Sequence, residues 1–228
     1  MKNALKYAFK HSIPIFVGWV PVALAYGVLM QSAGYNALWT VACSVSVYAG
    51  SLQFLMVSFF TGGVSLITVA VMALLLNSRH IFYGLPFIEK FREFGPWKYF
   101  MIYTLSDESF SLQCSHNFGE DVNEKWAYVF TALLLVAYWA VLSVLGSFIG
   151  SLIPFDTTGI DFALTALFIT ILVDQIKEAE NILPAVIAFV SSLLCLAIIG
   201  AENFILPSLV ATVAVLVILR PKLEKEAE

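Results

Sequence analysis

The sequence predicts an all-α, polytopic membrane helix bundle of about eight hydrophobic segments, with broken or re-entrant segments allowed among them. Three observations predict this class. Hydrophobic residues make up 60% of the 228-residue chain and charged residues only 12%, against about 45–50% and about 25% in soluble domains. The mean hydropathy is +0.88. Several apolar segments reach the roughly 20 residues that a helix needs to cross a hydrocarbon core about 30 Å thick. We expect a single transmembrane domain over residues 1–228.

The hydrophobic segments follow one another with short polar links between them. They cover about residues 12–30, 38–60, 64–87, 99–115, 126–153, 162–173, 182–199 and 204–219. The N-terminal lysines are typical of a signal peptide, but no small-residue cleavage pattern follows them, so we expect the first segment to be retained. The sixth segment is short, which is typical of a half-helix in a transporter or of a tilted span.

Small and helix-distorting residues mark the first, second and fifth segments. In the first, Pro21 and Gly27 predict a kink and close helix contacts. The second carries Gly50 within the polar run SVSVYAGSLQF, so it either packs tightly against other helices or unwinds beside a cavity. In the fifth, Gly146 and Gly150 have GxxxG spacing, which indicates helix packing.

Charged and polar residues inside the third and fourth segments are the main functional signal. Asn77, Arg79 and His80 lie within an otherwise apolar third segment, and Asp107 and Glu108 lie in the middle of the fourth. An arginine at the centre of a bilayer costs about 2.5–3.5 kcal/mol on insertion scales, so it needs a partner or a ligand. We therefore interpret this cluster as the lining of a solute path. Two alternatives remain: a helix-end anchor at the headgroups, and a purely structural salt bridge.

The placement of basic residues predicts the orientation but leaves one conflict. Three lysines precede the first segment, and Arg220, Lys222 and Lys225 follow the last, so we expect both termini in the cytoplasm. Simple alternation would then place the basic link at residues 89–98 outside, against the positive-inside rule. A re-entrant or broken segment among the first three would resolve the conflict, and the second segment is the best candidate.

Composition argues against several other classes of protein. The net charge is −4, whereas a nucleic-acid-binding protein needs a basic stripe. Cys43, Cys114 and Cys195 lie in separate segments and match no zinc or redox spacing. No GxSx-type nucleophile signature accompanies the histidines. We expect no nucleic acid, no enzyme activity, no cofactor and no metal site, and we expect the lipid bilayer as the surroundings.

Four motifs in order along the first half of the chain resemble the AzlC family. They are PVALAYG in the first segment, YAGSLQF in the second, NSRHIFYG in the third and LSDESF in the fourth. DFALTALF in the sixth segment is also similar to that family's pattern. The resemblance implies a bacterial inner-membrane permease that exports valine, leucine or isoleucine. It also implies a small hydrophobic partner subunit, AzlD, that is needed for transport.

The chemistry of such a substrate suggests roles for the polar residues. A zwitterionic amino acid needs a positive donor, a negative acceptor and an apolar pocket. We expect Arg79 to bind the carboxylate, because its planar fork can hold both oxygens, and Asp107 to bind the ammonium, with Glu108 in reserve. The further predicted substrate-binding residues are Asn77, Tyr48, Gln53, Tyr83 and Tyr103.

Export against a gradient needs energy coupling, and proton antiport is the economical hypothesis. Asp107 or Glu108 would release a proton when the substrate ammonium arrives, and His80 would relay it, since histidine changes charge near neutral pH. Two other functions remain open on the sequence: a channel or exporter for another small neutral solute, and a non-transporting membrane scaffold.

Overall fold

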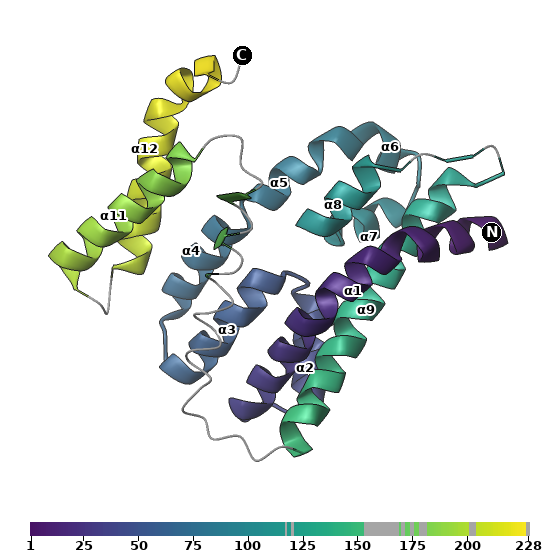
Figure 1. Cartoon of the computed structure of the whole chain (residues 1–228), viewed down its shortest axis with the longest axis horizontal. Helices are drawn as coiled ribbons and strands as arrows, with labels where there is room; N and C mark the ends of the chain where they lie inside the picture. Colours follow the sequence, from purple (N-terminus) through teal and green to yellow (C-terminus); the bar gives the residue numbers. More distant parts are fainter. Residues whose placement is uncertain are drawn as a thin grey trace. The chain divides into compact units, whose positions relative to one another are not determined.

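A computed structural model describes residues 1–116, 118–119, 121–152, 169, 172–173, 176–177, 182–200 and 204–226. Within these residues the regular structure is entirely helical, with no strand (Figure 1). The predicted all-α class is confirmed. The chain divides into two compact units: Met1–Val64 with Leu76–Ile160, and Ser65–Leu75 with Asp161–Glu228. The single domain expected over residues 1–228 stays a prediction.

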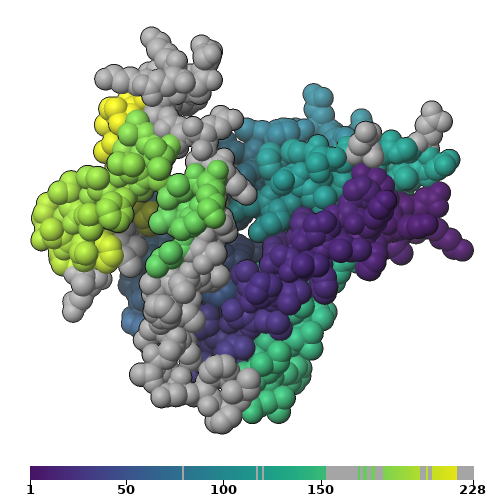
Figure 2. Space-filling view, in the orientation of Figure 1, coloured from purple at the N-terminus to yellow at the C-terminus, as the bar shows by residue number. Residues whose placement is uncertain are grey.

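Two long apolar helices, α1 (Lys2–Ser32) and α9 (Glu124–Leu152), form the frame of the first unit. Both are long and apolar enough to cross a membrane. Their contacts in order are Asn3 with Asp121 just before α9, Ser12 with Tyr138, and Gln31 with Ser147. Because the residue numbers rise together, the two helices run parallel. Figure 2 shows α1 and the C-terminal part of α9 side by side.

Glycines allow α1 and α9 to approach closely. A Cβ added to Gly27 would lie 1.9 Å from the Ser143 carbonyl oxygen, and one on Gly146 would lie 2.2 Å from the Leu24 carbonyl oxygen. No side chain fits at either position. The packing role predicted for the GxxxG pair of α9 is confirmed, and Gly27 belongs to the same contact. α1 continues as one helix through Pro21, so the predicted kink there stays a prediction.

The second, third and fourth hydrophobic segments are each broken. The second forms α2 (Ala37–Ser46) and α3 (Gly50–Gly62), as expected for a segment that unwinds. The third forms α4 (Leu66–Asn77) and α5 (Arg79–Tyr83), followed by η1 (Leu85–Phe87) and α6 (Ile88–Arg92). Residues 66–77 and 80–92 together make a third candidate span. The fourth forms α7 (Trp97–Tyr103) and α8 (Asp107–Cys114).

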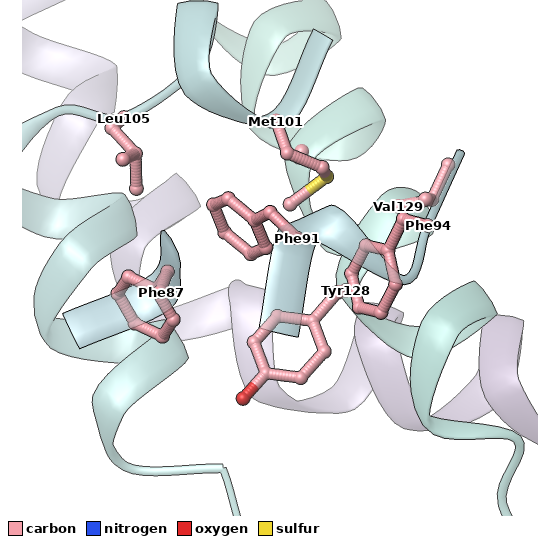
Figure 3. Packing of buried hydrophobic residues seen from close by; sticks show 8 residues of the cluster. Phe87, Phe91, Phe94, Met101, Leu105, Tyr128 and Val129 are labelled. Atoms are coloured by element: carbon pink, nitrogen blue, oxygen red, sulfur yellow. The ribbon is translucent and has the colours of Figure 1, made fainter. Parts of the chain in front are cut away.

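A buried aromatic cluster fixes η1, α6 and α7 on the N-terminal half of α9. Its buried members are Phe87, Phe91, Phe94, Met101, Leu105, Tyr128, Val129 and Ala132. Figure 3 shows their side chains converging from these helices. Phe87 and Phe91 stack with ring centroids 5.0 Å apart. At the edge of this cluster, Lys90 forms an ion pair with Glu124 and a hydrogen bond with the Tyr128 hydroxyl.

The second unit contains α11 (Leu183–Ile199) and α12 (Ile205–Glu226), which pack against each other. They match the seventh and eighth predicted segments. The sixth predicted segment, at about residues 162–173, lies almost entirely outside the described residues, and the predicted total of about eight segments therefore stays a prediction.

Candidate functional site

A small open pocket lies where the three broken segments meet. It has a volume of about 50 Å³, which is room for a few water molecules if each needs about 10–15 Å³. Its lining residues come from the breaks: Ala49, Gly50 and Ser51 at the start of α3; Asn77 and His80 at the α4–α5 break; Ser106, Asp107 and Glu108 at the start of α8. Four of the predicted polar site residues, on two different segments, thus face one space.

The start of α3 forms the first wall. Ala49 occupies the N-cap position and offers no side-chain acceptor to the first N–H groups of the helix. Those groups and the helix dipole favour a negative charge at this end. The preceding residue, Tyr48, has a positive φ of 44°, a left-handed conformation that costs roughly 1–2 kcal/mol for a residue with a Cβ. The chain therefore turns sharply into α3 at the pocket.

The start of α8 forms the second wall and supplies both carboxylates. The Ser106 side chain accepts a hydrogen bond from the Ser109 N–H, and the Ser109 side chain accepts one from the Ser106 N–H, which is a capping box. Asp107 and Glu108 thus occupy the first turn of a helix, where its dipole stabilises negative charge. The Ser106 hydroxyl also donates to the Glu108 carboxylate over 3.0 Å.

The α4–α5 break forms the third wall. Asn77 ends α4, and the backbone of Arg79 begins α5 next to the pocket residue His80. The Tyr83 hydroxyl donates a hydrogen bond to the Asp107 carboxylate. The Tyr83 ring stacks on Phe110, with ring centroids 4.8 Å apart. Tyr83 therefore holds Asp107 in position and connects the third segment to the fourth.

Three other predicted substrate-binding residues lie outside the pocket lining. Gln53 is fully buried, accepts a hydrogen bond from the Trp139 indole over 2.9 Å, and lies 3.5 Å from the Ser44 hydroxyl. Tyr103 donates its hydroxyl hydrogen to the Val45 carbonyl. Tyr48 is buried, and its hydroxyl has no hydrogen-bond partner among the described residues. Gln53 and Tyr103 thus make contacts within the protein.

The sequence interpretation did not include Ser51 and Ser106 among the site residues, and it treated the fourth segment as a continuous helix. It expected both carboxylates in the middle of a helix, whereas the structure places them at a helix start. The order Ser106, Asp107, Glu108 is a helix-start signature that could have revealed this break. Among the described residues, no group of three or more His, Cys, Asp and Glu side chains could hold a metal ion.

Residues 14–153 match the family model described as "AzlC protein". This range includes most of α1, all of α9 and every residue of the pocket. The chain belongs to the AzlC family. It is a multi-pass protein of the inner membrane, as the resemblance and the hydropathy predicted.

Relatives match between three quarters and nearly all of the chain. A Bacillus subtilis relative named "Branched-chain amino acid transport protein AzlC" is 35% identical over 97% of this chain and 87% of its own length. A Helicobacter pylori (strain 26695) "Uncharacterized membrane protein" is 34% identical over 97% of both chains. The Escherichia coli "Inner membrane protein YgaZ" is 26% identical over 76% of this chain and 74% of its own length. No solved structure matches.

Proposed function

We propose that this AzlC-family chain is a permease that exports branched-chain amino acids and binds their head group in the pocket between the broken segments. The observation that carries the proposal is the joint presence of two carboxylates and an uncapped helix start in one small space. The name of the B. subtilis relative, a branched-chain amino acid transport protein, supports the substrate class.

The charges around the pocket suit the two ends of a zwitterion. On the α8 wall, the carboxylates of Asp107 and Glu108 attract an ammonium group. On the α3 wall, the N–H groups at the start of the helix lie at the positive end of the helix dipole, and they favour a carboxylate. Arg79, whose backbone begins α5 beside the pocket, is the second proposed carboxylate ligand. Discontinuous helices whose ends face the substrate are typical of secondary transporters.

The size of the pocket indicates which part of the substrate it holds. A volume of about 50 Å³ accommodates an ammonium and a carboxylate group in place of a few waters. A branched aliphatic side chain needs further apolar space. The stacked rings of Tyr83 and Phe110 extend from Asp107 into the aromatic cluster. We propose that the aliphatic side chain of the substrate lies beside these rings.

Proton antiport is the proposed source of energy for export. Asp107 and Glu108 are the candidate proton carriers, because an arriving ammonium group and a bound proton compete for the same carboxylate. His80 lines the same pocket and its ring lies 5.6 Å from that of Tyr83, so it is the proposed relay. A small AzlD-like membrane subunit is the proposed partner for transport.

Reconstitution tests the proposal. Proteoliposomes containing this chain and the small subunit, loaded with unlabelled valine, should accumulate labelled valine transiently by counterflow at two external pH values. Imposed pH gradients should change net flux. A channel would instead equilibrate valine downhill without counterflow, and a scaffold would give no flux with or without its partner. Either result would contradict the proposal.

A further inference from the structure

The α2–α3 segment turns back at its break and returns to the end where it started. The Tyr35 ring, just after α1, lies 6.4 Å from the Trp39 ring at the start of α2 and 4.9 Å from the Phe60 ring near the end of α3. Both ends of the segment therefore lie beside the C-terminal end of α1. Its tip contacts Trp139, in the middle of α9: a Cβ on Gly50 would lie 3.4 Å from that ring.

The α7–α8 segment also turns back, but it starts from the opposite end. The ring of Trp97, at the start of α7, lies 5.8 Å from that of Trp126, in the first turn of α9. The Tyr128 hydroxyl donates to the carbonyl of Gln113, near the end of α8. Both ends of this segment therefore lie beside the N-terminal end of α9. Between them, Leu105 at the tip packs in the same cluster as Ala132.

The two tips meet at the pocket. The Tyr103 hydroxyl donates a hydrogen bond to the carbonyl of Val45. This is one of the last carbonyls of α2, and these have no N–H partner within the helix because the helix ends there. The Tyr48 and Tyr103 rings lie 6.1 Å apart. Residues of both tips line the pocket. Since α1 and α9 run parallel, their two ends define two opposite faces of the first unit. The α2–α3 segment starts and ends at one face, and the α7–α8 segment starts and ends at the other.

Basic residues distinguish the two faces. Seven lysines and arginines of the first unit lie in segments at the end where α1 and α9 begin: Lys2, Lys6, Lys10, Lys90, Arg92, Lys98 and Lys125. The ion pair of Lys90 with Glu124 fixes the 89–98 link at this end. By the positive-inside rule this end is cytoplasmic. The conflict in the sequence-based orientation disappears, because a re-entrant α2–α3 removes one crossing.

We propose that α2–α3 and α7–α8 are two re-entrant helical hairpins that enter the membrane from opposite faces, α2–α3 from outside and α7–α8 from the cytoplasm. The pocket lies between their tips and is separated from each face by one hairpin. Non-helical backbone is tolerated at this depth only where protein or a water-lined cavity surrounds it. The pocket and the Tyr103–Val45 contact provide such surroundings. The role of the hairpins in transport rests on the proposed function, whereas their topology does not.

Thiol labelling tests the topology. In a variant with Cys43, Cys114 and Cys195 replaced by serine, single cysteines are introduced by Ala33→Cys and Val64→Cys around α2–α3. Glu93→Cys and Gly119→Cys are the matching positions around α7–α8. A membrane-impermeant maleimide is added to intact and to permeabilised cells. Both positions of the first pair should react in intact cells, and both of the second pair only after permeabilisation.

Two results would overturn the proposal. If the members of either pair react from different faces, that segment crosses the membrane and is not a hairpin. If both pairs react from the same face, the hairpins do not oppose each other. If a variant is not expressed, Thr61→Cys serves as the alternative near Val64 and Ser115→Cys as the alternative near Gly119. Both positions are exposed. The labelling pattern does not require transport, so a failure of the proposed function leaves this test intact.

Discussion

The α1–α9 contact and the pocket lie in the same unit, but the first is built from continuous helices and the second from interrupted ones. At the contact, two helices run without a break, and glycines bring them together. At the pocket, three segments are interrupted, and side chains such as Tyr103 and Ser109 satisfy backbone groups that the breaks release. The long helices therefore provide rigidity, whereas the breaks present backbone polar groups to the pocket, where a continuous helix would present only side chains.

The largest effect is expected at the helix contact. Gly27→Ala places a Cβ 1.9 Å from the Ser143 carbonyl oxygen, so α1 and α9 must separate, and overpacking of this kind costs about 1–3 kcal/mol or more. We expect a clear loss of thermal stability in detergent. Gly18→Ala in the same helix is the matched control, because nothing lies within 4 Å of its new Cβ. Equal melting temperatures for the two variants would contradict the close contact.

At the pocket, loss of a carboxylate should remove transport without loss of folding. Asp107→Asn keeps the shape and removes the charge, and a charge-assisted hydrogen bond contributes about 1.5–3 kcal/mol. We expect a 10- to 100-fold fall in valine counterflow and a loss of its pH dependence, with normal membrane insertion. Glu108→Gln makes the same change at the neighbouring carboxylate and is the variant for comparison. If Asp107→Asn keeps full pH dependence, the proton is carried by another residue.

A smaller effect is expected from the hydroxyl that holds Asp107. Tyr83→Phe keeps the ring stacked on Phe110 but removes the hydrogen bond to the carboxylate. A hydrogen bond contributes about 1 kcal/mol, so counterflow should fall about fivefold. The control is Tyr99→Phe, at an exposed position. An unchanged rate in Tyr83→Phe would show that transport does not need the Tyr83 hydroxyl to position Asp107.

Gln53 should affect stability and leave substrate affinity unchanged. Gln53→Leu leaves the buried Trp139 indole N–H without its acceptor, which costs about 1–3 kcal/mol. We expect a lower melting temperature with the same concentration dependence of valine counterflow. A raised half-saturation concentration for valine, with unchanged stability, would instead indicate that Gln53 binds the substrate.

A separate effect concerns pH and His116, in the link before α9. Burial, with His11 and Lys90 nearby, lowers the pKa of His116 from its usual 6.5 to about 4. Between these values the unfolded chain binds more protons than the folded one, so stability should decrease as the pH falls from about 6.5 to about 4. Thermal melts of the wild type and of His116→Gln measure this. The slope should be shallower in the variant, and equal slopes would contradict the assignment.

The sequence predicted the helical class and the small-residue contact of α9, and it indicated the second segment as the best candidate for a break, because each leaves a local pattern. It also predicted that Asn77, His80, Asp107 and Glu108 belong together, since ionisable groups inside apolar segments need partners. It did not predict that Gln53 is held by Trp139, because that contact joins residues far apart in the chain. The breaks at Ser78 and at residues 104–106 were missed because apolar residues on both sides continue the hydropathy signal.

Protection of the pocket by substrate tests the central proposal most directly. Ser51 lines the pocket at the start of α3, and the Ser51→Cys variant in the cysteine-free background carries one reactive thiol there. With the small subunit present, L-valine should slow the modification of this thiol by a small thiol reagent, and L-lysine should have little effect. If the variant still transports labelled valine while valine leaves the modification rate unchanged, the substrate does not bind in this pocket.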